Sequence, residues 1–90
     1  MHRVRLIISG DVQGVGFRSW ALRYAQSRQL TGWVKNREDG TVEIVAEGTR
    51  VDLTDLINAC RKGPEVAWVK DVAVSWEAPS SEFAGFEVIY

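Results

Sequence analysis

The sequence has very few of the residues that hold metals or form disulfides. It contains one cysteine, Cys60, and one histidine, His2, among its 90 residues. A single cysteine cannot form an intramolecular disulfide, and a Cys/His metal site needs more ligands than these two residues supply. We therefore expect no metal and no other cofactor, and the chain suits a reducing compartment.

Long apolar runs and an excess of charge of one sign are also missing. No segment approaches the roughly 20 apolar residues of a membrane-spanning helix, and residues 1–9 do not read as a targeting segment. Eleven basic and twelve acidic residues give a formal charge of -1, and both signs are spread along the chain. These features argue against a nucleic-acid or membrane partner and favour a cytoplasmic protein.

The length of the chain allows one hydrophobic core and no more. Half of 90 residues would be too short for a second domain to offset its chain entropy. An apolar fraction of 46%, with four tryptophans, is enough to build that core. We expect residues 1–90 to form a single domain that is monomeric.

The first half of the chain alternates between strand and helix patterns. Residues 2–9 place Val4, Leu6 and Ile8 on one face, as in a strand with one buried side. A glycine-rich turn follows, and apolar residues recur at helical spacing from Phe17 to about Gln29. Residues 30–37 and 41–47 are predicted to pair as a hairpin, in which the Asp-Gly of the turn supplies the positive φ angles.

The second half repeats this alternation. Residues 51–62 carry an apolar helical stripe that ends at a Gly-Pro pair, and residues 66–76 and 86–90 have strand patterns. The stripe consists of Leu53, Leu56, Ile57 and Cys60. The order βαββαβ predicts an α+β, ferredoxin-like sandwich: an antiparallel sheet with two helices on one face and an additional short C-terminal strand.

The turn between the first strand and the first helix has the features of an anion site. Residues 10–18 read Gly-Asp-Val-Gln-Gly-Val-Gly-Phe-Arg. Glycines allow backbone N–H groups to face inward, the helix N-terminus adds free donors, and Arg18 offers a planar charged fork to two phosphate oxygens. Neither the P-loop nor the dinucleotide-binding glycine pattern is present. From these residues alone, a structural turn with a solvated Arg18 is an equal alternative.

A second segment, residues 32–36, reads Gly-Trp-Val-Lys-Asn and precedes Gly-Thr-Val at 40–42 and Gly48. Together with Val-Gln-Gly-Val-Gly-Phe-Arg at 12–18, it resembles the two signature motifs of the acylphosphatase family, in their order and spacing. The resemblance continues in Gly63-Pro64, in residues 69–72 and in Phe-Ala-Gly-Phe-Glu-Val at 83–88. It thus covers almost the whole chain.

The resemblance implies both an activity and a set of site residues. The family has the ferredoxin-like fold and hydrolyses acyl phosphates to a carboxylate and inorganic phosphate without a metal. The phosphoryl group would be bound by Gln13, Gly14, Val15, Gly16, Phe17 and Arg18, the first of these through its backbone more than its side chain. Asn36 would hold the attacking water, although on its own it reads as a turn residue at a strand end. Inorganic phosphate or sulfate could occupy the same site.

The chemistry of an acyl phosphate explains why so few catalytic groups are needed. The leaving group is a carboxylate, whose conjugate acid has a pKa of about 4, so its departure requires no general acid. Phosphoryl transfer depends mainly on positioning and on stabilising the charge of the transition state. An amide cannot act as a base, but Asn36 can orient a water molecule, whose proton we expect to pass to a phosphate oxygen of the substrate.

Three other functions remain open from the sequence. A ferredoxin-like RNA-binding module would need an aromatic RNA-binding motif and a basic face, and the chain has neither. A regulatory domain could bind an anion in the glycine turn without turnover. The chain could also be a module of a larger carbamoyl-phosphate-handling enzyme, but no zinc-ligand cysteines follow, so we expect a free-standing enzyme.

Two further expectations concern Gln29 and the tryptophans Trp33 and Trp68. Gln29 stands at the end of the first helix, where acylphosphatases commonly have a glycine that could cap the helix in a left-handed conformation. Trp33 and Trp68 are expected to pack within the fold, with the alternative that one of them borders the entrance for the acyl group.

Overall fold

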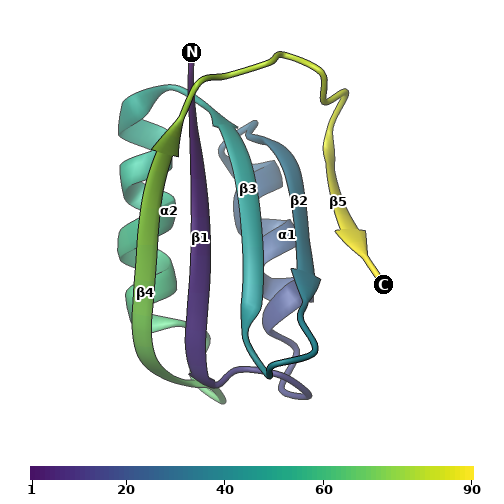
Figure 1. The fold of residues 1–90 in the computed structure, drawn as a ribbon, viewed down its shortest axis with the longest axis vertical. Helices are drawn as coiled ribbons and strands as arrows, with labels where there is room; N and C mark the ends of the chain where they lie inside the picture. Colours follow the sequence, from purple (N-terminus) through teal and green to yellow (C-terminus); the bar gives the residue numbers. More distant parts are fainter.

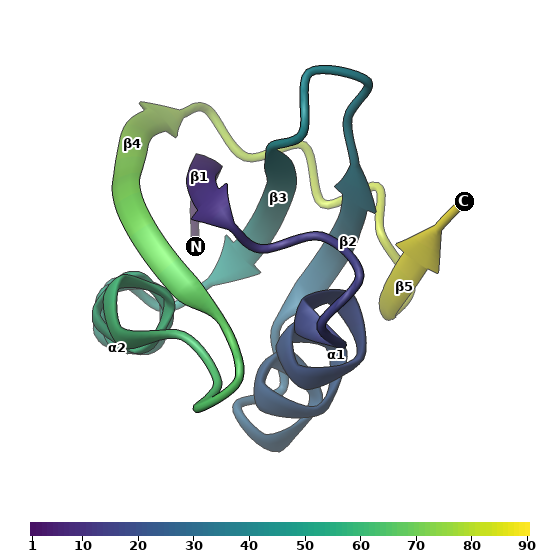
Figure 2. The same ribbon diagram turned by 90° about the horizontal axis from the view of Figure 1, so that it is seen from below.

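The computed structural model describes residues 1–90, which form a five-stranded sheet with two helices on one face (Figure 1). The elements are β1 (His2–Asp11), α1 (Phe17–Ser27), β2 (Thr31–Asn36), β3 (Val42–Gly48), α2 (Arg50–Lys62), β4 (Trp68–Glu77) and β5 (Phe86–Ile89). The strand order is β4-β1-β3-β2-β5. Seen from below, α1 and α2 lie on the same side of the sheet (Figure 2). This architecture confirms the predicted ferredoxin-like sandwich.

The core lies between the sheet and the two helices. Val4, Leu6 and Ile8 of β1 are buried, as their alternation predicts. The predicted apolar stripe of α2 is buried as well, and α1 contributes Phe17 and two alanines. Since these residues form one continuous cluster, packing against the sheet holds both helices. Neither helix is long and apolar enough to cross a membrane.

The sheet is mixed, because the pairing of β5 is parallel whereas all other strand pairings are antiparallel. β1, β2, β3 and β4 pair antiparallel, whereas β5 pairs parallel with β2, with Lys35 opposite Ile89. It follows that β1, β2 and β5 all point the same way. Their carboxyl ends therefore lie at the same end of the sheet.

Helix α1 ends two residues earlier than predicted, in a left-handed turn. Gln29 has a φ angle of 58°. The amide of Gln29 donates to the carbonyl of Gln26, and the amide of Leu30 donates to that of Ala25, which is the Schellman pattern. The position thus has the geometry that favours glycine, and a glutamine occupies it at a cost in backbone strain.

The β2–β3 turn differs from the prediction in one respect. Only Gly40 has a positive φ angle, 88°, and Asp39 does not. The amide of Gly40 donates to the carbonyl of Arg37, which gives a three-residue loop, residues 38–40 as predicted, with one left-handed glycine. Asp39 contributes by its side chain, which accepts hydrogen bonds from the amide and the hydroxyl of Thr41.

Strand β4 is an exposed edge, and the expectation that Trp68 packs within the fold is wrong. The side chain of Trp68 is 62% exposed, whereas Trp33 is half-buried on β2. Only Val72 of β4 is fully buried; α2 packs against the inner face of the strand, and no further strand pairs with its outer edge. Simple alternation places Trp68 on the same face as Val72, but Ser9 pairs with Asp71 and Gly10 pairs with Val69, so the register shifts between them. Val69 therefore packs against the core in place of Trp68.

A buried carboxylate fixes the connection between β4 and β5. Glu47 accepts hydrogen bonds from the amides of Ser80 and Ser81, at 2.8 and 3.0 Å, and from Nε of Arg3 at 2.7 Å. Burial alone would raise the pKa of Glu47, but these hydrogen bonds and the charge of Arg3 outweigh it and lower the pKa. The connection is thereby held across the sheet, and β5 reaches its place beside β2.

Candidate functional site

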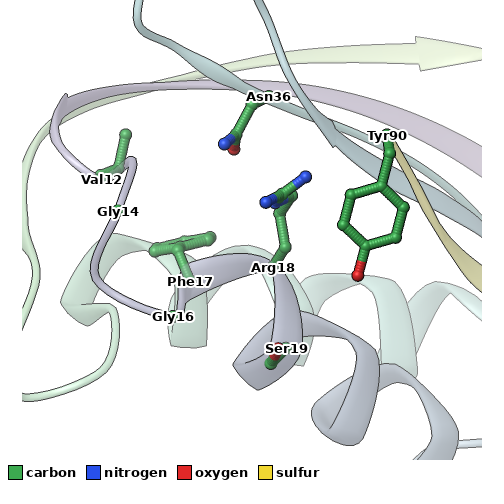
Figure 3. Close-up of a pocket in the computed structure, with 8 residues that line it drawn as sticks. All are labelled: Val12, Gly14, Gly16, Phe17, Arg18, Ser19, Asn36 and Tyr90. Atoms are coloured by element: carbon green, nitrogen blue, oxygen red, sulfur yellow. The ribbon is translucent and has the colours of Figure 1, made fainter.

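A small cavity of about 80 Å³ opens where β1, β2 and β5 end and α1 begins (Figure 3). It is lined by Val12, Gly14, Gly16, Phe17, Arg18, Ser19, Asn36 and Tyr90. The first six belong to the turn after β1 and to the first turn of α1, whereas Asn36 and Tyr90 come from the ends of two other strands. Residues far apart in the sequence thus meet around one space.

The backbone of this turn is shaped by two glycines in the left-handed region. Gly14 and Gly16 have φ angles of 75° and 81°. A Cβ atom at either position would meet no neighbour within 4 Å, so the requirement for glycine comes from the backbone conformation and not from crowding. Residues that alternate between right- and left-handed conformations turn successive N–H groups toward one side of the chain, which makes a concave surface suited to anions.

The N-terminus of α1 adds further unsatisfied donors to the cavity. Gly16 is its N-cap, no side chain caps the helix, and the first turn contains no acidic residue. The first helical hydrogen bond runs from the amide of Trp20 to the carbonyl of Gly16, at 3.0 Å. The amides before Trp20 therefore have no partner within the helix, and they carry the positive end of its dipole.

Arg18 stands at the centre of the site without a counter-ion. All ion pairs of the structure involve other residues, on the open face of the sheet, at the hairpin and between Arg28 and Asp55. The guanidinium points across the cavity toward Asn36 (Figure 3). Its Cζ atom lies 4.8 Å from the centre of the Tyr90 ring, a cation–π distance. The charge of Arg18 is thus available to an anion in the cavity.

Asn36 carries the one buried side-chain polar atom without a hydrogen-bond partner. Its Oδ1 atom is inaccessible to solvent and accepts no hydrogen bond from the protein. A buried polar group left unpaired costs about 1–3 kcal/mol, and such groups are usually explained by a water molecule or a ligand. Asn36 lines the cavity opposite Arg18, so this unpaired oxygen belongs to a side chain that a molecule bound in the cavity would contact.

The side chain of Gln13 does not face the cavity. Its Nε2 atom donates to the carbonyls of Arg37, at 2.7 Å, and Thr41, at 2.9 Å. These two hydrogen bonds tie the glycine turn to the hairpin that carries Asn36. Gln13 therefore contacts the neighbouring loop by its side chain.

Of the residues expected to bind phosphate, four line the cavity and two do not. Gly14, Gly16, Phe17 and Arg18 line it, together with Asn36. Val15 is half-buried against the core, and Gln13 bonds to the hairpin. Both contribute to the turn that forms the cavity wall, but their side chains lie elsewhere.

Sequence reasoning missed three lining residues: Val12, Ser19 and Tyr90. The first two adjoin predicted residues, so their position along the turn and the helix start was a usable signal. Tyr90 had none, because it reaches the cavity only through the parallel pairing of β5 with β2. No periodicity in the sequence reveals which strand β5 joins.

The structure contains no group of three or more His, Cys, Asp or Glu side chains that could hold a metal ion. Cys60 is buried in the core and does not line the cavity, and burial raises the pKa of its thiol to about 12. A thiol with so high a pKa stays protonated at neutral pH and is a poor nucleophile. It belongs to the core of α2, as its position on the apolar stripe indicates.

A family model, a curated relative and a solved structure all point to the same family. The family model described as Acylphosphatase matches residues 4–88. An acylphosphatase of Roseiflexus sp. is 46% identical over 90 residues, which is all of this chain and 97% of that protein. The crystal structure of acylphosphatase from Bacillus subtilis is 40% identical and superimposes with a TM-score of 0.95, each chain being covered completely. Full-length HypF, in a phosphate- and nucleotide-bound form, contains a similar unit over 12% of its chain, at 26% identity and a TM-score of 0.84.

Proposed function

The chain belongs to the acylphosphatase family and acts as an acylphosphatase, and we propose that the cavity between Arg18 and Asn36 is its active site. The observation that carries this proposal is the pairing of an arginine without a counter-ion and an unpartnered buried amide oxygen across one small cavity. The substrate is a small acyl phosphate, and the products are a carboxylate and inorganic phosphate.

Arg18 and the backbone of the glycine turn bind the phosphoryl group. A guanidinium can donate two parallel hydrogen bonds to phosphate oxygens, and the free amides at the start of α1 can donate to the others. In the transition state of phosphoryl transfer, negative charge spreads over three equatorial oxygens. Donors that are already in place around these oxygens stabilise this charge without having to reorganise.

Asn36 positions the attacking water. Its carboxamide offers an acceptor oxygen to a water proton and two N–H donors, so it can orient the lone pair of the water toward phosphorus. The water attacks in line with the leaving carboxylate, and its proton passes to a phosphate oxygen of the substrate. As a neutral amide, Asn36 acts by positioning and takes up no proton.

No acid is needed for the leaving group and no metal for the charge. A carboxylate leaves readily because its conjugate acid has a pKa of about 4. We propose that Arg18 and the backbone amides supply the positive charge that a metal supplies in other phosphoryl-transfer enzymes. Inorganic phosphate or sulfate is expected to bind in the same cavity as an inhibitor.

The proposed catalytic unit is the whole of residues 1–90, working as a single monomeric domain in the cytoplasm. A near-neutral balance of interspersed charges and a single buried cysteine support this setting. The C-terminal strand is part of the unit because Tyr90, which follows it, lines the cavity.

Hydrolysis of benzoyl phosphate in the presence of a chelator tests the function. We expect the protein to hydrolyse this substrate. If the folded protein does not, the proposed enzymatic function is wrong. If hydrolysis requires added Mg²⁺, the metal-free mechanism is wrong. Arg18→Ala is expected to lower kcat by about 10³-fold or more, as for arginines that stabilise phosphoryl transition states. Arg28→Ala is the matched control, because Arg28 lies at the other end of α1 and pairs with Asp55.

A further inference from the structure

The proposed active-site cavity has room for a phosphoryl group and little more. Its volume is about 80 Å³. Each water molecule takes up about 30 Å³ of the liquid, so the space corresponds to only a few water molecules. The acyl part of a substrate must therefore lie outside this cavity, against residues at its mouth.

A wider, open groove of about 510 Å³ adjoins the cavity. It is lined by Lys35, Asn36, Arg37, Glu38, Glu43, Ile89 and Tyr90. Only Asn36 and Tyr90 line both the cavity and the groove. A group that extends from a bound phosphoryl group into the groove consequently runs past these two side chains.

The charges of the groove are balanced in number, and its ion pairs centre on Glu43. Two basic residues, Lys35 and Arg37, face two acidic ones, Glu38 and Glu43. The carboxylate of Glu43 is 3.9 Å from both Lys35 Nζ and Arg37 Nη1, and Arg5 pairs with it from β1. Both basic residues of the groove are thus paired with Glu43, and its uncharged lining residues are Asn36, Ile89 and Tyr90.

Tyr90 has one ring face on Arg18 and an otherwise open environment. The residue is 97% exposed, although its ring lies 4.8 Å from the guanidinium carbon of Arg18 (Figure 3). Because such an exposed aromatic side chain contributes little to the core, its position calls for a different explanation. Trp33 and Trp68, the other candidates for an aromatic contact at the entrance, line neither the cavity nor the groove.

We propose that Tyr90 is the acyl-group contact of the enzyme and determines its preference among acyl phosphates. This inference rests on the function proposed above. The ring packs against a planar or apolar acyl group while Arg18 and the turn hold the phosphoryl group. Aromatic acyl phosphates gain this contact, whereas the single methyl group of acetyl phosphate covers too little of the ring to do so.

The test compares benzoyl phosphate and acetyl phosphate in the intact protein and its variants. Tyr90→Ala is expected to lower kcat/KM for benzoyl phosphate by about 3- to 10-fold, the range of an aromatic pair contact, and for acetyl phosphate by less than about 2-fold. The inhibition constant of inorganic phosphate should change by less than about 2-fold, because phosphate lacks an acyl group. Tyr90→Phe should retain the ratio of the two substrates.

Trp68→Ala provides the matched control, since it removes another exposed aromatic side chain, 62% exposed, from β4 at the far edge of the sheet. It should leave the ratio unchanged. If Tyr90→Ala lowers kcat/KM equally for both substrates, or weakens inhibition by phosphate to the same extent, Tyr90 acts only by positioning Arg18 and the inference is wrong. If the unmodified protein hydrolyses neither substrate, the proposed function itself fails. Activity toward both substrates with a ratio insensitive to Tyr90 overturns the specificity role alone.

Discussion

Replacing Gln13 should separate the two halves of the proposed active site without removing either. The carboxamide of Gln13 donates to the carbonyls of Arg37 and Thr41, and Arg37 directly follows Asn36. Gln13→Met keeps the length of the side chain but removes both donors. We expect the glycine turn to retain its own conformation, while the hairpin that carries Asn36 loses its attachment to that turn.

The loss of stability can be estimated from the partners that remain. An intramolecular hydrogen bond contributes about 0.5–1.5 kcal/mol net. Both carbonyls keep another donor in the variant, because Gly40 donates to Arg37 at 3.2 Å and Arg37 donates to Thr41 at 2.8 Å. No buried carbonyl is then left unpaired, so we expect the lower part of the range for two bonds, about 1–1.5 kcal/mol. For a domain of this size, that corresponds to a Tm lower by about 4–10 °C.

The effect on activity should be larger than the effect on stability, because catalysis depends on distance. A displacement of about 1 Å can lower a rate by about 10²-fold. We expect Gln13→Met to reduce kcat at least 10-fold, with the inhibition constant of phosphate nearly unchanged, since Arg18 and the turn amides remain. Gln13→Glu should be more damaging at pH 7, because its carboxylate would face two carbonyl oxygens. The pKa of the introduced group is raised there, so the additional loss of stability should lessen as the pH falls through that value.

Steady-state kinetics and urea unfolding of the same variants decide the matter. Asp39→Ala is the control: it removes hydrogen bonds to Thr41 within the same hairpin but none to the glycine turn. It should lower stability by about 1 kcal/mol and leave kcat within about 2-fold. The reasoning is refuted if Gln13→Met and Asp39→Ala affect kcat equally, or if Gln13→Met is as active as the unmodified protein.

Three further predictions concern the stability of the fold. Gln29→Gly should stabilise the protein by about 1 kcal/mol in urea unfolding, because it relieves a left-handed backbone conformation, whereas Gln29→Ala should not. The thiol of Cys60, whose pKa is about 12, should react with a thiol reagent only in urea; rapid labelling of the native protein would contradict its burial. The pKa of Glu47 is lowered by folding, so its contribution to stability should be complete above the ordinary value of 4.5 and decline as the pH falls further. The free energy of unfolding of Glu47→Gln should accordingly depend less on pH in the acid range. The same pH dependence in both proteins would argue against this role of Glu47.

The sequence was sufficient for the fold because its patterns are local and consistent. The burial of Val4, Leu6 and Ile8 follows from simple alternation, and the stripe of α2 follows from helical spacing. What failed were features that depend on tertiary position. Trp68 is exposed because the register of β4 shifts against β1, so that Val69 packs against the core instead, and the pattern of β4 itself does not reveal this shift.

The site was predictable in part, and unequally among its residues. An anion site at Arg18 could be inferred from the glycines and the helix start, whereas Asn36 could be chosen only by family resemblance. The structure gives an independent reason for its choice, since its Oδ1 atom is buried and unpartnered and the residue lines the cavity. Such a reason cannot be read from a sequence, because the burial of one atom depends on segments that meet only in the folded chain.

The direction of the strands separates the chemistry of this fold from much of its polar stabilisation. β1, β2 and β5 run the same way, so the glycine turn, Asn36 and Tyr90 all follow carboxyl ends and meet at one end of the sheet. β3 and β4 run the opposite way, and Glu47 lies near the end of β3, where Arg3 begins the opposing strand. Glu47 and its partners Arg3, Ser80 and Ser81 are not among the residues that line the cavity. Changes at Glu47 can therefore alter stability while the cavity keeps all its lining groups. The exception is β5, whose preceding connection is held by Glu47. Any loss of activity in Glu47→Gln should therefore affect benzoyl phosphate, through Tyr90, before it affects acetyl phosphate.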